Sequence, residues 1–107
     1  MRKDEPVPPV AEIERQLLAA LCAPGLDRET RAAILERLAT HAFANSDHEV
    51  IFRALAKMPD ANAEHIRRTL GARLTRLGFP DIDVEPMFEL PPQPADKIKS
   101  LLQHLSR

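Results

Sequence analysis

The sequence of Ser46–Met58 is SDHEVIFRALAKM, and its pattern predicts a helix that is apolar on most sides. Ser46 with Glu49 three residues later is typical of a capping box, in which the two side chains bind backbone N–H groups of the first helical turn. Beyond this start, only Glu49, Arg53 and Lys57 form a polar line at helical spacing, and the remaining sides are largely apolar. We therefore predict a core helix that begins at Ser46 and exposes one narrow face.

Two further helices are predicted before this stretch. Residues 10–22 carry apolar side chains at helical spacing until Pro24-Gly25 interrupts the pattern. Asp27 is a suitable N-cap for a second helix that ends near Thr40. Phe43 stands just ahead of the core helix, where an aromatic side chain usually pins the incoming chain against the helix that follows.

A fourth helix is predicted after Pro59, with Asn62 as its N-cap and Gly78 just past its end. The apolar stripe of this helix consists of Ile66, Leu70, Leu74 and Leu77. Four helices within 107 residues leave room for one domain with a single modest core.

The last third of the chain changes character. Residues 79–94 alternate acidic and apolar side chains and are rich in proline, which we take to forbid a helix and to favour an extended arm. The arm would strap across its own helices or dock on a partner. Asp96 is the predicted N-cap of a short last helix over residues 95–107, which could also be swapped onto a second copy to make a homodimer.

These elements predict an all-α fold. It consists of a disordered tail over residues 1–9, a bundle of four core helices over 10–78, an extended proline-rich arm over 79–94 and the short C-terminal helix.

Composition narrows the functional class. The formal net charge of −1 disfavours binding of nucleic acid, which usually requires a basic excess. Cys22 is the only cysteine, so an intrachain disulfide is impossible and the cytoplasm is the expected compartment. Neither a signal peptide nor a membrane-spanning stretch is recognisable, so we expect no association with a membrane.

The supply of catalytic groups is small. The four histidines, His41, His48, His65 and His104, fall on different predicted elements and lack the spacing of a helical metal site. With three glycines in the chain, a glycine-rich phosphate loop is nearly excluded. We therefore predict that the protein is not an enzyme, has no catalytic, cofactor-binding or metal-binding residue, and has no buried reactive group in its core.

The candidate partner-binding residues are apolar side chains of the arm and last helix, with two arginines of the fourth helix. They are Ile82, Val84, Met87, Phe88, Ile98, Leu101, Leu102, Leu105, Arg67 and Arg68. On a helical projection, Arg67, Arg68, Arg73 and Arg76 fan out around the fourth helix and do not form one anion-binding patch.

The chain resembles the N-terminal helical domain of bacterial replicative helicases of the DnaB type in three segments. These segments are residues 9–21, Phe43 and residues 48–55. That domain is similar in fold to the C-terminal helicase-binding domain of DnaG-type primases. The resemblance covers residues 9–77. The matching positions are Glu12, Leu17, Leu18, Leu21, Phe43, His48, Ile51, Phe52 and Ala54.

The resemblance implies a head domain that associates with the helicase or primase and has no catalysis of its own. The helicase ATPase domain and the zinc and polymerase parts of a primase have no counterpart here. The family's long helical hairpin, which drives its dimerisation, is replaced by the arm and the short last helix.

The leading prediction is a non-catalytic protein–protein interaction module, a stand-alone relative of the replication head acting in DNA replication. One alternative is a helical nucleic-acid-binding domain that uses the second and third helices. Another is a small enzyme or ligand carrier with His41 or His65 inside a pocket between helices.

Overall fold

The first helix is the centre of the molecule, and every other described helix contacts it. The structure is a computed structural model that describes residues 9–58, 62–89 and 94–105. Within these ranges the regular secondary structure is entirely helical, which confirms the all-α prediction. The helices are α1 (Val10–Cys22), α2 (Arg28–Ala39), α3 (Ser46–Ala56), α4 (Ala63–Arg76), α5 (Glu85–Glu89) and α6 (Ala95–Leu105).

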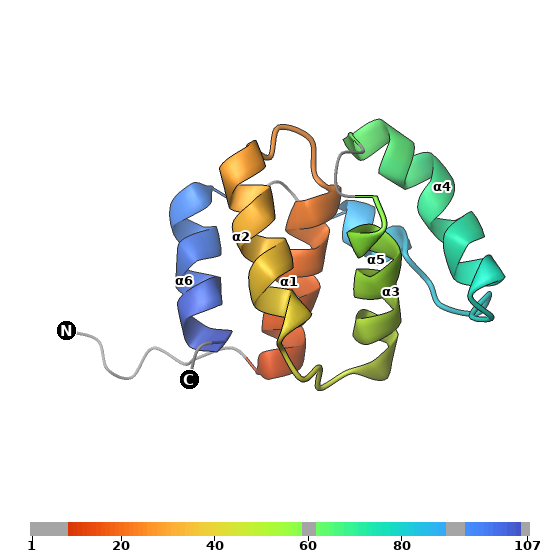
Figure 1. Ribbon diagram of the computed structural model, residues 1–107, viewed down its shortest axis with the longest axis horizontal. Coiled ribbons are helices and arrows are strands. Elements are labelled where there is room, and N and C mark those ends of the chain that lie inside the picture. The colour runs from red at the N-terminus through yellow and green to blue at the C-terminus, as the bar shows by residue number, and fades with distance from the viewer. Residues whose placement is uncertain (1–8, 59–61, 90–93, 106–107) are drawn as a thin grey trace.

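α1 is central because it carries apolar side chains on almost all of its sides. Its fully buried large residues are Ile13, Leu17, Leu18 and Leu21. Figure 1 shows α2 and α6 on one side of α1, and α3 followed by α4 on the other. The hydrophobic core is therefore continuous from α6 to α4 through α1.

The predicted starts of α2 and α4 are confirmed by their caps. The carboxylate of Asp27 accepts a hydrogen bond from the Thr30 backbone N–H at 3.1 Å. The Asn62 side chain likewise accepts from the His65 N–H at 2.8 Å. Each cap satisfies a first-turn donor that has no partner inside the helix.

The start of α3 differs from the predicted capping box. The N-cap is Asn45, whose side-chain oxygen accepts from the backbone N–H groups of Asp47 at 2.8 Å and His48 at 3.2 Å. Asn is as strong an N-cap as Ser. Ser46 is consequently the first helical residue, and the predicted capping role of Ser46 is wrong although the predicted start is right.

The end of α4 has the geometry that Gly78 predicts. Gly78 has a φ of 96°, and its N–H donates to the Thr75 carbonyl at 3.0 Å. The N–H of Phe79 donates to the Leu74 carbonyl at 2.8 Å. These two hydrogen bonds form a Schellman motif. Leu77, predicted as part of the buried stripe, is instead 47% exposed. It lies past the last turn that packs on the core.

The prediction that residues 79–94 contain no helix is wrong for part of the segment. α5 forms within it and packs against α1, with Met87 buried in the core. Pro86 is tolerated because it falls in the first turn, where a backbone N–H has no intrahelical acceptor.

α6 also belongs to the core. It begins at Ala95, so Asp96 lies in the first turn and is not the N-cap. Its buried side chains are Ile98, Leu101 and Leu105. Arg37 of α2 donates a hydrogen bond from Nη2 to the Leu105 carbonyl at 2.7 Å, which caps the end of α6 and fixes it to α2 of the same chain.

The core therefore includes side chains from α5 and α6 as well as from the four predicted helices. The tail before Pro9 and the predicted stop at Pro59 lie outside the described residues. Among the described helices, none is both long and apolar enough to span a bilayer.

Candidate functional site

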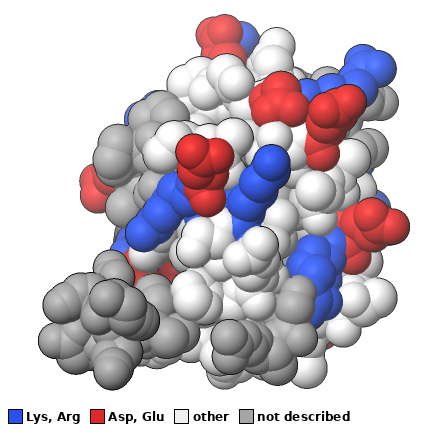
Figure 2. Space-filling model, turned by 90° about the vertical axis from the view of Figure 1, so that its left-hand side faces the viewer, with Lys and Arg blue, Asp and Glu red and all other residues white. Residues whose placement is uncertain are grey.

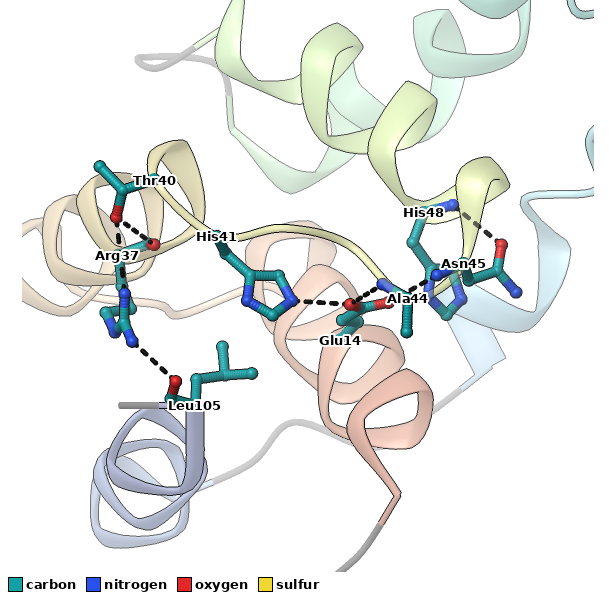
Figure 3. Close-up of polar contacts among 8 residues, drawn as sticks. All are labelled: Glu14, Arg37, Thr40, His41, Ala44, Asn45, His48 and Leu105. Atoms are coloured by element: carbon teal, nitrogen blue, oxygen red, sulfur yellow. Dashed lines mark hydrogen bonds and ion pairs between the residues drawn. The ribbon is translucent and has the colours of Figure 1, made fainter. Parts of the chain in front are cut away.

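The most polar point inside the molecule is the carboxylate of Glu14, which has no exposed surface. His41 Nε2 lies 2.7 Å from Glu14 Oε2, and His48 Nδ1 lies 3.0 Å from Glu14 Oε1. The backbone N–H of Ala44 donates to Oε2 at 2.6 Å, and that of Asn45 lies 3.4 Å from Oε1 (Figure 3). We call these five residues the Glu14 cluster.

The cluster keeps Glu14 ionised. Burial alone raises the pKa of the Glu14 carboxyl, but the hydrogen bonds from Ala44, His48 and His41 outweigh it and hold the pKa below its ordinary value. An ionised carboxylate only accepts hydrogen bonds, so both ring nitrogens that face it carry hydrogen. Both carboxylate oxygens are thus engaged by donors of the chain itself.

Sequence analysis did not predict this cluster, which places a buried carboxylate in the core and brings together histidines from two different elements. His41 and His48 meet because Glu14 bridges the segment after α2 and the first turn of α3. A signal was present in the sequence, since Glu14 shares one helical face with Leu17, Leu18 and Leu21.

Full engagement of its oxygens makes the Glu14 cluster a structural tether. It fastens the connection between α2 and α3, and the start of α3, onto α1. Within the described ranges, no three or more His, Cys, Asp or Glu side chains are grouped so that they could hold a metal ion. The bond from His48 holds the start of α3 on α1.

Aromatic contacts extend from the cluster to the surface of α3. The Phe43 ring meets the His41 ring edge to face, with centroids 4.9 Å apart. On its other side Phe43 packs on Phe52, with centroids 5.7 Å apart. Phe52 is half-buried and lines a groove between α3 and α4.

This groove, the α3/α4 groove, has a volume of about 580 Å³. Its apolar lining consists of Phe52, Ala54, Ala56 and Leu77. Its charged lining is entirely basic and consists of Arg53, Lys57, Arg73 and Arg76. The lining faces come from the second half of α3 and the end of α4, where the helical spacing of four places Phe52 beside Ala56 and Arg73 beside Leu77.

The cations of the groove are mostly unpaired. Arg53 bonds to Glu49 at 3.2 Å across exposed surface. Lys57, Arg73 and Arg76 have no ion pair with any acidic side chain of the described ranges. Four like charges therefore surround the apolar side chains of this groove.

The opposite side of the molecule has a different surface. Figure 2 views the side on which α6 lies, and acidic and basic side chains are interspersed there. The recess between α2 and α6 is lined by one residue of each sign, Glu36 and Arg37. Mixed charge of this kind is the ordinary solvated surface of a globular domain.

Four of the predicted partner-binding side chains do not lie on the surface. Met87, Ile98, Leu101 and Leu105 are buried in the chain's own core and are not displayed to a partner. Their burial follows from the packing of α5 and α6 on α1. Ile82, Val84, Phe88 and Leu102 are half-buried and packed against the same core.

The two predicted arginines have partners within the chain. The Arg67 guanidinium lies 5.3 Å from the centre of the Phe88 ring, and Arg68 bonds to Glu64 at 3.3 Å. Arg73 and Arg76, which are not among the predicted site residues, line the α3/α4 groove. Projecting one helix could not reveal this, because the groove needs the second wall from α3.

His41 and His65, the two histidines of the enzyme or ligand-carrier alternative, have other surroundings than an interhelical pocket. His41 is turned to Glu14, and His65 is exposed at the start of α4. Burial raises the pKa of the Cys22 thiol to about 12, so the reactive thiolate does not form at neutral pH.

No protein-family model, curated protein or solved structure matches the chain.

Proposed function

We propose that this domain is a non-catalytic protein-interaction module that binds another protein through the α3/α4 groove. The observation that carries the proposal is a groove of about 580 Å³ whose lining joins exposed apolar surface to unpaired cations. Exposed apolar surface rimmed by polar groups is typical of protein-binding sites.

The contrast with the Glu14 cluster supports a binding role over a catalytic one. The buried Glu14 carboxylate has its oxygens engaged by the chain itself, whereas the groove offers apolar area and three cations without an ion pair in the described ranges. A surface of that kind stabilises a complex, because binding removes its apolar area from water.

The resemblance of residues 9–77 to the replicative-helicase head suggests the partner. We therefore propose the replicative helicase or the primase of the same cell, and a role in DNA replication. Three of the matching positions, Phe43, Phe52 and Ala54, lie in or next to the groove. Three of the nine positions that carry the resemblance are thus close to the surface that we propose for binding.

Calorimetric titration of the full chain with each of the two proteins tests this proposal. We expect saturable binding to at least one of them, weakened by Leu77→Gln in the groove. Val10→Gln is the matched control, because Val10 is 45% exposed and Leu77 is 47% exposed. Val10 begins α1 and does not line the groove.

Two outcomes contradict the proposal. No heat with either protein refutes the replication assignment. Binding that Leu77→Gln and Val10→Gln affect equally refutes the assignment of the groove as the binding surface.

A further inference from the structure

We infer that the occupant of the α3/α4 groove is an acidic amphipathic helix, with a row of apolar side chains between flanking Asp or Glu residues. This inference rests on the proposed function and adds the chemical class of the segment that binds. It follows from the charge of the lining, the nature of the walls and the position of the apolar side chains.

The charge of the lining favours an acidic occupant. Arg53 and Lys57 stand on the α3 wall and Arg73 and Arg76 on the α4 wall, while the lining contains no Asp or Glu. The chain as a whole has 15 Lys and Arg against 16 Asp and Glu, so this concentration of one sign is local. A carboxylate on either flank of an occupant would meet a cation on the corresponding wall.

Helix C-termini alone do not account for these cations. Arg53, Arg73 and Arg76 lie in the last turns of their helices, where a positive charge is favourable. That interaction needs only the presence of the charge, so it leaves the guanidinium donors of Arg73 and Arg76 free, whereas Arg53 also bonds to Glu49. Because two helix ends converge on one groove, the cations of both helices are available to a single partner.

The walls favour a helix over an extended peptide. An added strand needs an open sheet edge with unpaired backbone groups. Both walls here are helices, whose backbone groups are bonded within the helix. An occupant therefore binds through side chains, and a helix presents an apolar row that can pack on Phe52, Ala56 and Leu77.

The apolar lining also distinguishes a peptide from nucleic acid. Three of its four members are aliphatic, and Phe52 is half-buried against Phe43. A single-stranded nucleic acid needs exposed aromatic faces on which its bases can stack. The groove therefore suits apolar side chains better than bases.

Three designed peptides test the inference against the full chain by fluorescence anisotropy. Each has about 16 residues, enough to form a helix, and the same leucine row, flanked by Glu, Gln or Lys. We expect the Glu-flanked peptide to bind about tenfold more tightly than the Gln-flanked one, and the advantage to shrink as salt rises.

Charge reversal gives a readout that misfolding cannot imitate. In the variant K57E/R73E/R76E we expect the preference to invert, so that the Lys-flanked peptide binds best. The control variant R28E/K97E/K99E has the same change of net charge on residues outside the groove lining and should keep the wild-type order. Circular dichroism checks that both variants remain helical.

The outcomes separate the two proposals. Equal affinity for the Glu- and Gln-flanked peptides, with loss of both in Leu77→Gln, overturns the acidic class and leaves the groove as a protein-binding surface. Binding of a single-stranded oligonucleotide in the groove, with no binding of any peptide, overturns the proposed function as well. An unchanged peptide order in K57E/R73E/R76E overturns the inference directly.

Discussion

The Glu14 cluster and the α3/α4 groove involve the same helix, α3, but they treat charge in opposite ways. At the start of α3, one carboxylate is enclosed and engaged by four donors of the chain. At its end, four cations surround open apolar surface, and most lack a partner among the described residues. The internally satisfied groups at the start of α3 stabilise the fold, whereas the cations at its end are available to the partner that we propose.

The largest effect is expected from Glu14→Ala. The variant leaves two imidazoles and two backbone N–H groups without their acceptor, and a buried donor without an acceptor costs about 1–3 kcal/mol of unfolding free energy. Urea denaturation followed by circular dichroism measures the loss. A variant too unstable to fold in the absence of urea would agree with this expectation.

Glu12→Ala is the matched control for Glu14→Ala. Glu12 lies on the same helix and pairs with Arg15, but both side chains are about one-third exposed. We expect a loss within about 1 kcal/mol for such a partly exposed pair. Equal losses in the two variants would show that the Glu14 cluster does not stabilise the fold more than a surface pair does.

The same cluster predicts loss of stability in acid. The folded-state pKa of Glu14 lies below its ordinary value of 4.5. The stabilisation from ionised Glu14 is therefore complete above about pH 4.5 and is lost as the pH falls through the lower folded-state pKa. Unfolding free energies measured by urea titration between neutral pH and acid should show this decline.

Glu14→Gln should remove that part of the acid dependence. The pKa of Glu12 is also lowered, through hydrogen bonds from Arg15 and Gln16, so Glu12→Gln is the appropriate comparison. We expect the stability curve of Glu14→Gln to be flatter in acid than that of Glu12→Gln. The reverse order would place the main acid-sensitive contact outside the cluster.

Phe43→Ala should affect both regions, because the Phe43 ring contacts His41 on one side and Phe52 on the other. For a half-buried aromatic side chain we expect a loss of about 2 kcal/mol, below that of a fully buried one. Binding of the Glu-flanked peptide should weaken too, since Phe52 loses its support.

Phe79→Ala is the control for Phe43→Ala, because Phe79 is 43% exposed and does not line the groove. Its effect should stay within about 1 kcal/mol, with peptide binding unchanged. If Phe43→Ala lowers stability but leaves peptide binding intact, the cluster and the groove are independent.

Much of the fold could be predicted from local sequence. The caps at Asp27 and Asn62 and the C-terminal turn at Gly78 depend on neighbouring residues only, and the structure has all three. α5 is not predicted by the proline content of its segment, because a proline excludes a helix only beyond the first turn and Pro86 lies within it.

The candidate site was harder to predict because it depends on contacts between distant elements. Glu14 and His48 are 34 residues apart, and their contact needs α1 and α3 side by side. The α3/α4 groove likewise combines residues 52–57 with residues 73–77. A helical projection of α4 alone shows arginines that fan out, and only the α3 wall makes them part of one recess.

The smallest change in stability is expected from the groove itself. Lys57→Gln and Arg76→Gln remove two exposed cations that have no ion pair within the described ranges. The lost attraction to the helix ends is partly offset by relief of repulsion between like charges, so the unfolding free energy should change by less than about 1 kcal/mol. Affinity for the Glu-flanked peptide should nevertheless fall. A stability loss comparable to that of Glu14→Ala, without a change in affinity, would show that these cations stabilise the fold, and the distinction between the two ends of α3 would be lost.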